Sequence, residues 1–118
     1  MKVYSASEAG EKLLADLPTW SYADGAIRRE YKVQAWKGAV MLTNAVAHLA
    51  ELAFHHPDLE VSWGKVVVKL TTHSAGGITD KDFELGRVIE AFANWKPGPG
   101  STLDGTPEDP QYAYVLER

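Results

Sequence analysis

Three of the four histidines lie in the stretch from residue 51 to residue 82, which an acidic residue begins and another ends. The histidines are His55, His56 and His73, and the acids Glu51 and Asp82 stand at the two ends of the stretch. An imidazole titrates near pH ~6.5, so it both donates and accepts protons at neutral pH. This set of side chains therefore suggests proton-transfer chemistry.

The elements around these residues determine which side chains can meet. Glu51 lies four residues before His55, so both are expected on one side of a helix, where the carboxylate can orient the imidazole. Pro57 disfavours helical geometry at His56, so this helix should end near His55. Asp82 falls in the first turn of the next predicted helix, where the helix dipole favours a carboxylate.

Each of these residues also has a purely structural interpretation. Histidines at a helix end can interact with its last free carbonyl groups, and His73 can end a strand in solvent. Glu51 can be a solvated helix charge, and Asp82 can serve only as a favourable charge at its helix start. A metal site is the main competing use of the histidines. However, adjacent His55 and His56 point in different directions, and no HExxH spacing is present.

Size and composition restrict the possible partners. The chain has 118 residues with 45% hydrophobic content, which fits one domain with one core. Its net charge of -4 gives no long-range attraction to nucleic acid or anionic lipid. There is no cysteine, no secretory signal and no apolar run of the ~20 residues that a membrane span needs. A cytoplasmic protein without disulfides is expected, and no P-loop, dinucleotide-binding motif or serine elbow is found.

The remaining pattern predicts helices and strand pairs in alternation. Ser7 can cap a first helix, Asp24-Gly25 is typical of a tight hairpin turn, and Thr79 can cap a last helix. The predicted elements are a helix at 7–17, strands at 20–23 and 26–33, a helix at 36–55, strands at 60–63 and 65–72, and a helix from 79 to about 94.

The predicted helix at 36–55 carries two apolar rows. One row includes Leu42 and Val46 and can cover a sheet, whereas the other includes Trp36, Val40 and Phe54 and lies on another side. A small domain can cover only one of them, so the second row predicts a homo-oligomer, either a dimer or a tetramer.

The chain changes character after residue 95. Residues 96–111 are rich in proline and glycine and cannot form regular helix or central strand, so they predict an extended arm. Some strand character returns at Tyr112, Tyr114 and Val115, which can dock on a sheet edge, bind a neighbouring subunit or stay mobile. We therefore divide the chain into a domain at 1–95 and a C-terminal extension at 96–118.

The spacing of the chemical residues resembles the signature of the pterin-4a-carbinolamine dehydratase family. The resemblance extends upstream to Trp20 and fades after about Asn94. Trp63 departs from the pattern, since the family more often has a tyrosine there, and the phenolic hydroxyl is lost. The positions that match the signature are Glu51, His55, His56, Pro57, Trp63, His73 and Asp82.

The resemblance implies an α+β fold, with a four-stranded antiparallel sheet and three helices packed on one face. It also implies that 4a-hydroxytetrahydropterin loses water to give the quinonoid dihydropterin, without a cofactor and without a metal. This reaction belongs to the recycling of tetrahydrobiopterin. A protein-binding scaffold on the same fold, acting as a dimerisation cofactor or assembly chaperone, is the alternative.

Residue roles also follow from the resemblance. His55 and His73 are implied as the proton-transfer groups, and His56 as a binding or orienting group, all three within the catalytic set. Glu51 and Asp82 are implied to hold the imidazoles in position. The residues implied to contact the pterin are Pro57, Trp63, Thr72 and Ser74.

Overall fold

Two β-hairpins supply the sheet, and a helix precedes each of them. The computed structural model describes residues 1–116, so the end of the predicted terminal strand at 117–118 lies outside it. The α-β-β-α-β-β-α order confirms the α+β prediction. The elements are α1 (Ala6–Asp16), β1 (Ser21–Ala23), β2 (Ala26–Lys32), α2 (Ala35–Ala53), β3 (Asp58–Ser62), β4 (Lys65–Leu70), the 3-10 turn η1 (His73–Ala75) and α3 (Asp80–Ala93).

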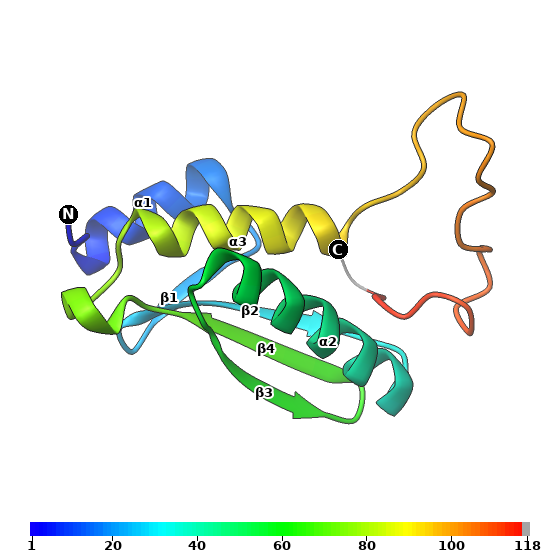
Figure 1. Cartoon of the computed structure of the whole chain (residues 1–118), viewed down its shortest axis with the longest axis horizontal. Coiled ribbons are helices and arrows are strands. Elements are labelled where there is room, and N and C mark those ends of the chain that lie inside the picture. The colour runs from blue at the N-terminus through cyan, green and yellow to red at the C-terminus, as the bar shows by residue number, and fades with distance from the viewer. Residues whose placement is uncertain (117–118) are drawn as a thin grey trace.

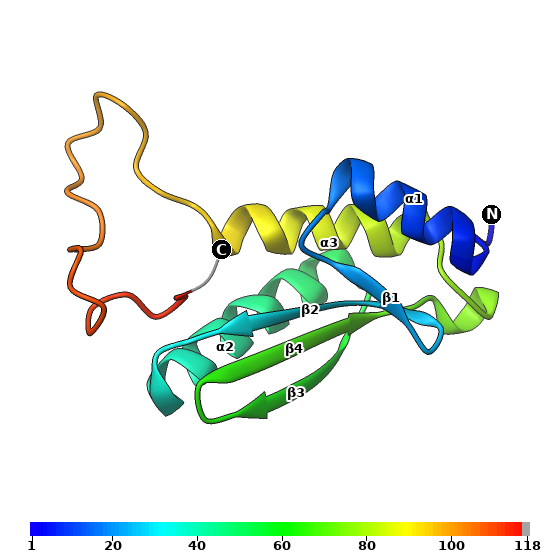
Figure 2. The ribbon, with the colours of Figure 1, turned by 180° about the vertical axis from the view of Figure 1, so that it is seen from behind.

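The four strands form one antiparallel sheet in the order β1-β2-β4-β3. All three helices lie on one side of it (Figure 1), and the opposite side is left open (Figure 2). Strand β4 is central, so it links the first hairpin to the second through its pairing with β2. The elements that carry the chemical residues, namely the end of α2, η1 and the start of α3, therefore meet around one sheet.

The alternation of side chains along a strand separates the two faces of the sheet. Ile27 and Tyr31 of β2 and Val68 and Leu70 of β4 are completely buried. They face the helices, whose apolar sides close the core. The buried helix residues include Ala9, Leu13, Leu42, Val46, Phe83 and Ile89.

One polar cluster lies on the helix-facing side of the sheet. The Oε1 atom of Glu90 on α3 accepts hydrogen bonds from Arg29 Nε at 3.0 Å, Trp20 Nε1 at 2.7 Å and the Tyr31 hydroxyl at 2.9 Å. Burial raises the pKa of Glu90, but the hydrogen bonds from these three groups outweigh it, so the net shift is downward. Arg29, which interrupts the apolar side of its strand in sequence, therefore ties α3 to β2.

The helix starts follow local capping rules, with one correction. Thr79 caps α3 as predicted, but Ser5 and not Ser7 caps α1. Ser5 accepts from the backbone N–H of Glu8, whose carboxylate accepts from the Ser5 N–H in return. This reciprocal pair satisfies two free donors, which a cap at Ser7 would leave open.

Three predicted element ends shift by two residues, and several others shift by one. Helix α2 ends at Ala53 and not at His55, because Phe54 adopts a left-handed conformation with φ 50° and closes the helix. Strand β3 starts earlier than predicted, at Asp58, and β4 ends at Leu70, two residues before Thr72. His55 therefore lies beyond the helix, in the connection to β3.

Most of the second apolar row is exposed in the single chain, although Ala50, which belongs to the same row, is buried. Trp36, Val40 and Phe54 are all at least partly open to solvent, whereas Leu42 and Val46 are buried against the sheet. The prediction that another subunit covers this row stays a prediction. Within residues 1–116, no helix combines the length and the hydropathy required to cross a membrane.

The C-terminal arm returns to the sheet after leaving α3. Val115 is buried and forms an isolated antiparallel bridge with Val33, just beyond the end of β2. The Leu116 N–H donates to the carbonyl of Lys32 at 2.8 Å. Of the three expectations for this segment, the described residues show docking on the sheet edge.

Candidate active site

His55 pairs with the buried carboxylate of Asp82. The distance from His55 Nε2 to Asp82 Oδ1 is 2.6 Å, and the two side chains are 14% and 0% exposed. The left-handed turn at Phe54 directs the chain out of α2 and places His55 near the first turn of α3. Two residues that lie 27 positions apart in the sequence thus form one buried unit.

The carboxylate of Asp82 is fixed by donors on its other oxygen. Its Oδ2 atom accepts the backbone N–H of Thr79 at 2.9 Å and the hydroxyl of Thr72 at 2.8 Å. The hydroxyls of Thr72 and Thr79 are themselves 2.7 Å apart. Because Thr72 donates to Asp82, the hydroxyl of Thr79 donates to Thr72. Asp82 therefore has both oxygens engaged and little freedom to rotate.

This arrangement determines which nitrogen of His55 is available. Asp82 serves as an acceptor, so His55 Nε2–H donates to Oδ1. In the neutral ring, Nδ1 is then the unprotonated nitrogen and can accept a proton from another molecule. A histidine whose far nitrogen is bonded to a carboxylate is the usual way to fix a tautomer. The pair is suited to moving one proton at Nδ1.

Glu51 pairs with His56 and not with His55, which corrects the expectation from helical spacing. His56 Nε2 lies 2.7 Å from Glu51 Oε2, and the side chains are 51% and 72% exposed. Since α2 ends at Ala53, His55 no longer continues the helical face of Glu51, and the i, i+4 relation does not apply. The ring of Phe54 stands edge-on to His56, with 5.3 Å between the ring centroids.

His73 lies in a different environment from the other two histidines. It begins η1, is exposed, and borders a polar cavity of about 500 Å³ beside the β1–β2 turn. Arg28 and Lys69 supply positive charge to this cavity, and Asp24 and Asp58 supply carboxylates. Neither His55 nor His56 lines it. Within one chain, the structure therefore places the three histidines in three separate settings.

The residues expected to contact a pterin are dispersed in the same way. Pro57 leads from His56 into β3, and Ser74 is exposed in η1. The hydroxyl of Thr72 is buried and committed to Asp82. Trp63 lies at the turn between β3 and β4, at the opposite end of that hairpin from Pro57. The roles of these residues toward a substrate stay predictions.

Sequence reasoning missed the support of Asp82 by Thr72 and the charged lining beside His73. The spacing of Thr79 and Asp82, three residues apart at a helix start, is the signal of a capping box that would have located the carboxylate. Arg28 lies opposite Lys69 in the sheet register, so correct strand pairing would have brought both to the same face. In residues 1–116, no group of three or more His, Cys, Asp or Glu side chains is placed to hold a metal ion.

Comparison with known proteins identifies relatives that match most of the chain. The family model described as pterin 4 alpha carbinolamine dehydratase matches residues 2–92. A protein of Aquifex aeolicus named "Putative pterin-4-alpha-carbinolamine dehydratase" is 45% identical over 85 residues, which cover 72% of this chain and 86% of that protein. A protein of the same name from Picosynechococcus is 47% identical over 72 residues, or 61% of this chain and 78% of the relative.

A solved structure agrees with these sequence matches. The crystal structure of a transcriptional coactivator/pterin dehydratase from Brucella melitensis superposes with a TM-score of 0.68 at 33% identity. The match covers 76% of this chain and 97% of the Brucella chain. The family model ends at residue 92, so the arm that follows α3 lies outside the family match.

Proposed function

Because the chain belongs to the pterin-4a-carbinolamine dehydratase family, we propose that it removes water from 4a-hydroxytetrahydropterin to give the quinonoid dihydropterin. The observation that carries this proposal is the buried pair of His55 and Asp82 at 2.6 Å. A histidine held in one tautomer by a fixed carboxylate is suited to proton transfer at neutral pH.

The reaction requires two proton movements. The bond from C4a to the hydroxyl oxygen breaks, and the departing oxygen takes up a proton and leaves as water. The proton on N5 is lost, and its electrons form the new double bond to C4a. We assign proton transfer to His55, through Nδ1, and to His73, and we assign His56 to binding and orienting the substrate. Asp82 positions His55, and Glu51 positions His56.

The polar cavity beside His73 supports a role for this second imidazole. It offers two carboxylates, two cations and the hydroxyl of Thr71 to a heterocycle that is rich in donors and acceptors. The proton transfers that assist the loss of water are assigned to side chains of this chain, and the proposed mechanism assigns no step to a cofactor or a metal. We assign this activity to the recycling of tetrahydrobiopterin, as the family membership implies.

The deciding experiment generates 4a-hydroxytetrahydropterin in place and follows the quinonoid product with and without the protein. Acceleration by the wild-type chain, and its loss when His55, His56 and His73 are all changed to Ala, supports the proposal. The accelerated rate should depend on pH, because proton transfer by an imidazole depends on its protonation state. A folded wild-type chain that gives no acceleration overturns the proposal.

A scaffold function is the second candidate, since the Brucella structure is described as both coactivator and dehydratase. A partner protein would bind the exposed apolar side chains Trp36 and Val40 on α2 and Phe54 just after it. We propose that a second copy of the chain covers this row, and light scattering should therefore give a dimer or tetramer. A monomer that forms a stoichiometric complex with another protein, and that has no turnover, favours the scaffold.

We also propose that catalysis resides in residues 1–95, because every assigned residue lies there. The extension at 96–118 contributes none of them. Deletion of residues 97–118 should expose Val33 and lower the thermal midpoint, yet leave turnover per folded molecule nearly unchanged. Loss of turnover in a folded deletion variant would place part of the site in the extension.

A further inference from the structure

The arm after α3 borders an open cavity that the proposed dehydratase chemistry does not use. The chain leaves α3 at Ala93, loops outward, and returns to the sheet edge at Val115 (Figure 1). Between the arm and the last turn of α3 lies a cavity of about 1040 Å³, which reaches the size of typical small-molecule sites. None of the three histidines borders it. We call this space the arm cavity.

Both ends of the arm are fixed to the domain. At the start, the side-chain amide of Asn94 donates to the backbone carbonyl and the carboxylate of Glu90. At the end, the Gln34 N–H donates to the carbonyl of Tyr114 at 2.8 Å. Gly38 of α2 makes room for this return, because a Cβ there would lie 3.0 Å from the Tyr114 carbonyl oxygen. The wall of the arm cavity is therefore attached at two points.

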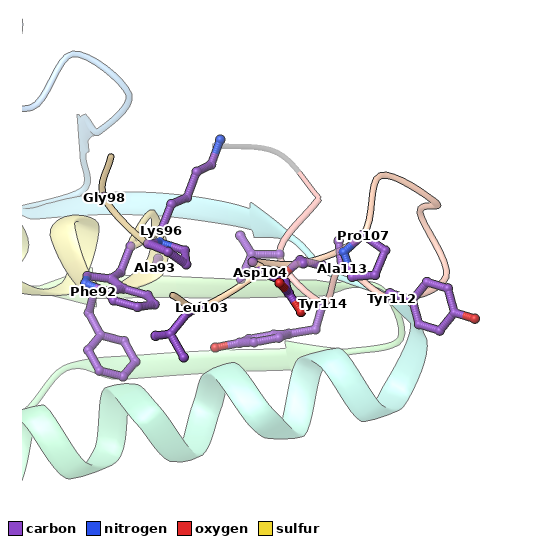
Figure 3. Close-up of a pocket in the computed structure, with 15 residues that line it drawn as sticks. Phe92, Ala93, Lys96, Gly98, Leu103, Asp104, Pro107, Tyr112, Ala113 and Tyr114 are labelled. Carbon is purple, nitrogen blue, oxygen red and sulfur yellow. The ribbon is translucent and has the colours of Figure 1, made fainter. Parts of the chain in front are cut away.

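Aromatic and apolar side chains from separate segments face the arm cavity. Phe92 comes from the last turn of α3, Trp95 from the segment just after it, Leu103 from the outer loop, and Tyr114 from the returning segment. Figure 3 shows the side chains of Phe92, Leu103 and Tyr114 gathered toward one another. Phe92, Trp95 and Leu103 are 47%, 65% and 62% exposed. A flat aromatic ring would cover these exposed apolar surfaces.

The charges around the arm cavity determine which charge a bound ring should carry. Asp104 lines the cavity, and among the described residues its carboxylate has no ion-pair partner. Lys96 also borders the cavity, but Figure 3 shows its side chain extending away from the clustered rings. The chain as a whole carries a charge of -4. A cation gains from both the carboxylate and the aromatic faces, whereas an anion gains from neither.

We propose that the arm cavity binds a planar aromatic amine. The ring system lies among Phe92, Trp95 and Tyr114, and the ammonium group faces Asp104. This binding is separate from the dehydratase site, so it holds whether or not the chain dehydrates pterins.

The test is a titration of the full-length ¹⁵N-labelled protein with three probes that share one ring and differ in charge. Tryptamine is cationic, indole is neutral, and indole-3-acetate is anionic. We expect saturable shifts of the backbone amides of Gly98, Gly105 and Ala113, which border the arm cavity. Tryptamine should bind most tightly and indole-3-acetate most weakly.

Two pairs of variants locate the site. Asp104→Asn should weaken the binding of tryptamine about tenfold and leave the binding of indole unchanged. Glu108→Gln removes a charge from the same arm outside the cavity and should change the affinity for neither probe. Leu103→Trp should place its own indole ring among the clustered side chains, compete with the probes and weaken the shifts. Leu14→Trp, at an exposed leucine of α1, should retain them.

Several outcomes would overturn the proposal. These are the absence of saturable shifts, shifts centred on Gly76 and Gly77 of the histidine region, and equal binding of indole-3-acetate and tryptamine. Equal effects of Asp104→Asn and Glu108→Gln would also exclude the assigned role of Asp104. Broadening of the arm signals with protein concentration alone would show that a second copy covers this surface instead.

Discussion

Two adjacent histidines each pair with a carboxylate at nearly the same distance, yet the two pairs differ in almost everything else. His55 and Asp82 are 2.6 Å apart, and His56 and Glu51 are 2.7 Å apart. The first pair connects two distant elements and is buried. The second pair connects residues at the end of one helix and is open to solvent. Distance alone therefore does not distinguish a positioned histidine from a surface ion pair.

The difference comes from what holds each carboxylate. Asp82 belongs to a capping box, and Thr72 and Thr79 fix its second oxygen. Glu51 stands on the exposed face of α2, where water competes for both of its oxygens. Exposed ion pairs contribute only ~0–1 kcal/mol, because solvent screens them and holding long side chains costs entropy. Burial with several donors instead fixes one geometry for His55.

The strongest test of this comparison replaces each histidine in turn. His55→Ala should lower kcat by ~10²–10⁴-fold, the typical contribution of a positioned general acid or base. His56→Ala should raise KM more than it lowers kcat, since its proposed role is binding. Steady-state kinetics on 4a-hydroxytetrahydropterin measure both. If both variants lose kcat equally, the assignment of catalysis to His55 and of binding to His56 is wrong.

Glu90 is a third carboxylate. It lies in a buried cluster but has no proposed role in catalysis, so its replacement tests the effect of burial on stability alone. Glu90→Gln should destabilise the fold by about 3 kcal/mol at neutral pH, because the buried guanidinium of Arg29 then loses the negative charge of Glu90 beside it. The pKa of Glu90 is lowered on folding, so its stabilisation is present above the unfolded value of ~4.3 and is lost as pH falls through the folded value.

Urea denaturation at several pH values measures this effect. The difference between wild type and Glu90→Gln should shrink as the pH falls below about 4. Glu84→Gln, at an exposed position of the same helix, is the matched control and should change stability little. A difference that stays constant down to low pH would show that the charge of Glu90 is not what stabilises the cluster.

The sequence predicted the fold well because its signals are local. The Asp24-Gly25 turn and the Thr79 cap each depend on neighbouring residues, and the structure contains both features. The partner of His55 was predicted wrongly for the opposite reason. The i, i+4 rule holds only while the helix continues, and the left-handed conformation of Phe54 ends it two residues earlier than expected.

Long-range contacts explain the other omissions. Thr72 reaches Asp82 across ten residues, and Arg28 meets Lys69 through strand pairing. Neither contact leaves a periodic signal in the sequence. The family resemblance supplied the identity of the chemical residues, but it did not specify which carboxylate each histidine contacts.

A smaller effect is expected from Asp82→Asn. The amide retains the size of the carboxylate but loses its charge, and it can present a donor to His55 Nε2, which favours the wrong tautomer. We expect kcat to fall by roughly 10–100-fold, as is typical when the partner that orients a functional histidine is altered. The pH profile of kcat should move as well, whereas a purely structural role for Asp82 would leave the profile in place.

The smallest effect is expected from Glu51→Gln. The pair that it alters is exposed and is worth at most ~1 kcal/mol, so kcat/KM should change by less than about fivefold. Any change should fall mainly on KM, because Glu51 acts only through His56. Added salt should weaken the wild-type pair and bring its KM toward that of the variant, since exposed charges are screened. If Glu51→Gln instead lowers kcat as much as Asp82→Asn does, a bound substrate or a second copy of the chain must bury this pair, and the two carboxylates then have equivalent roles.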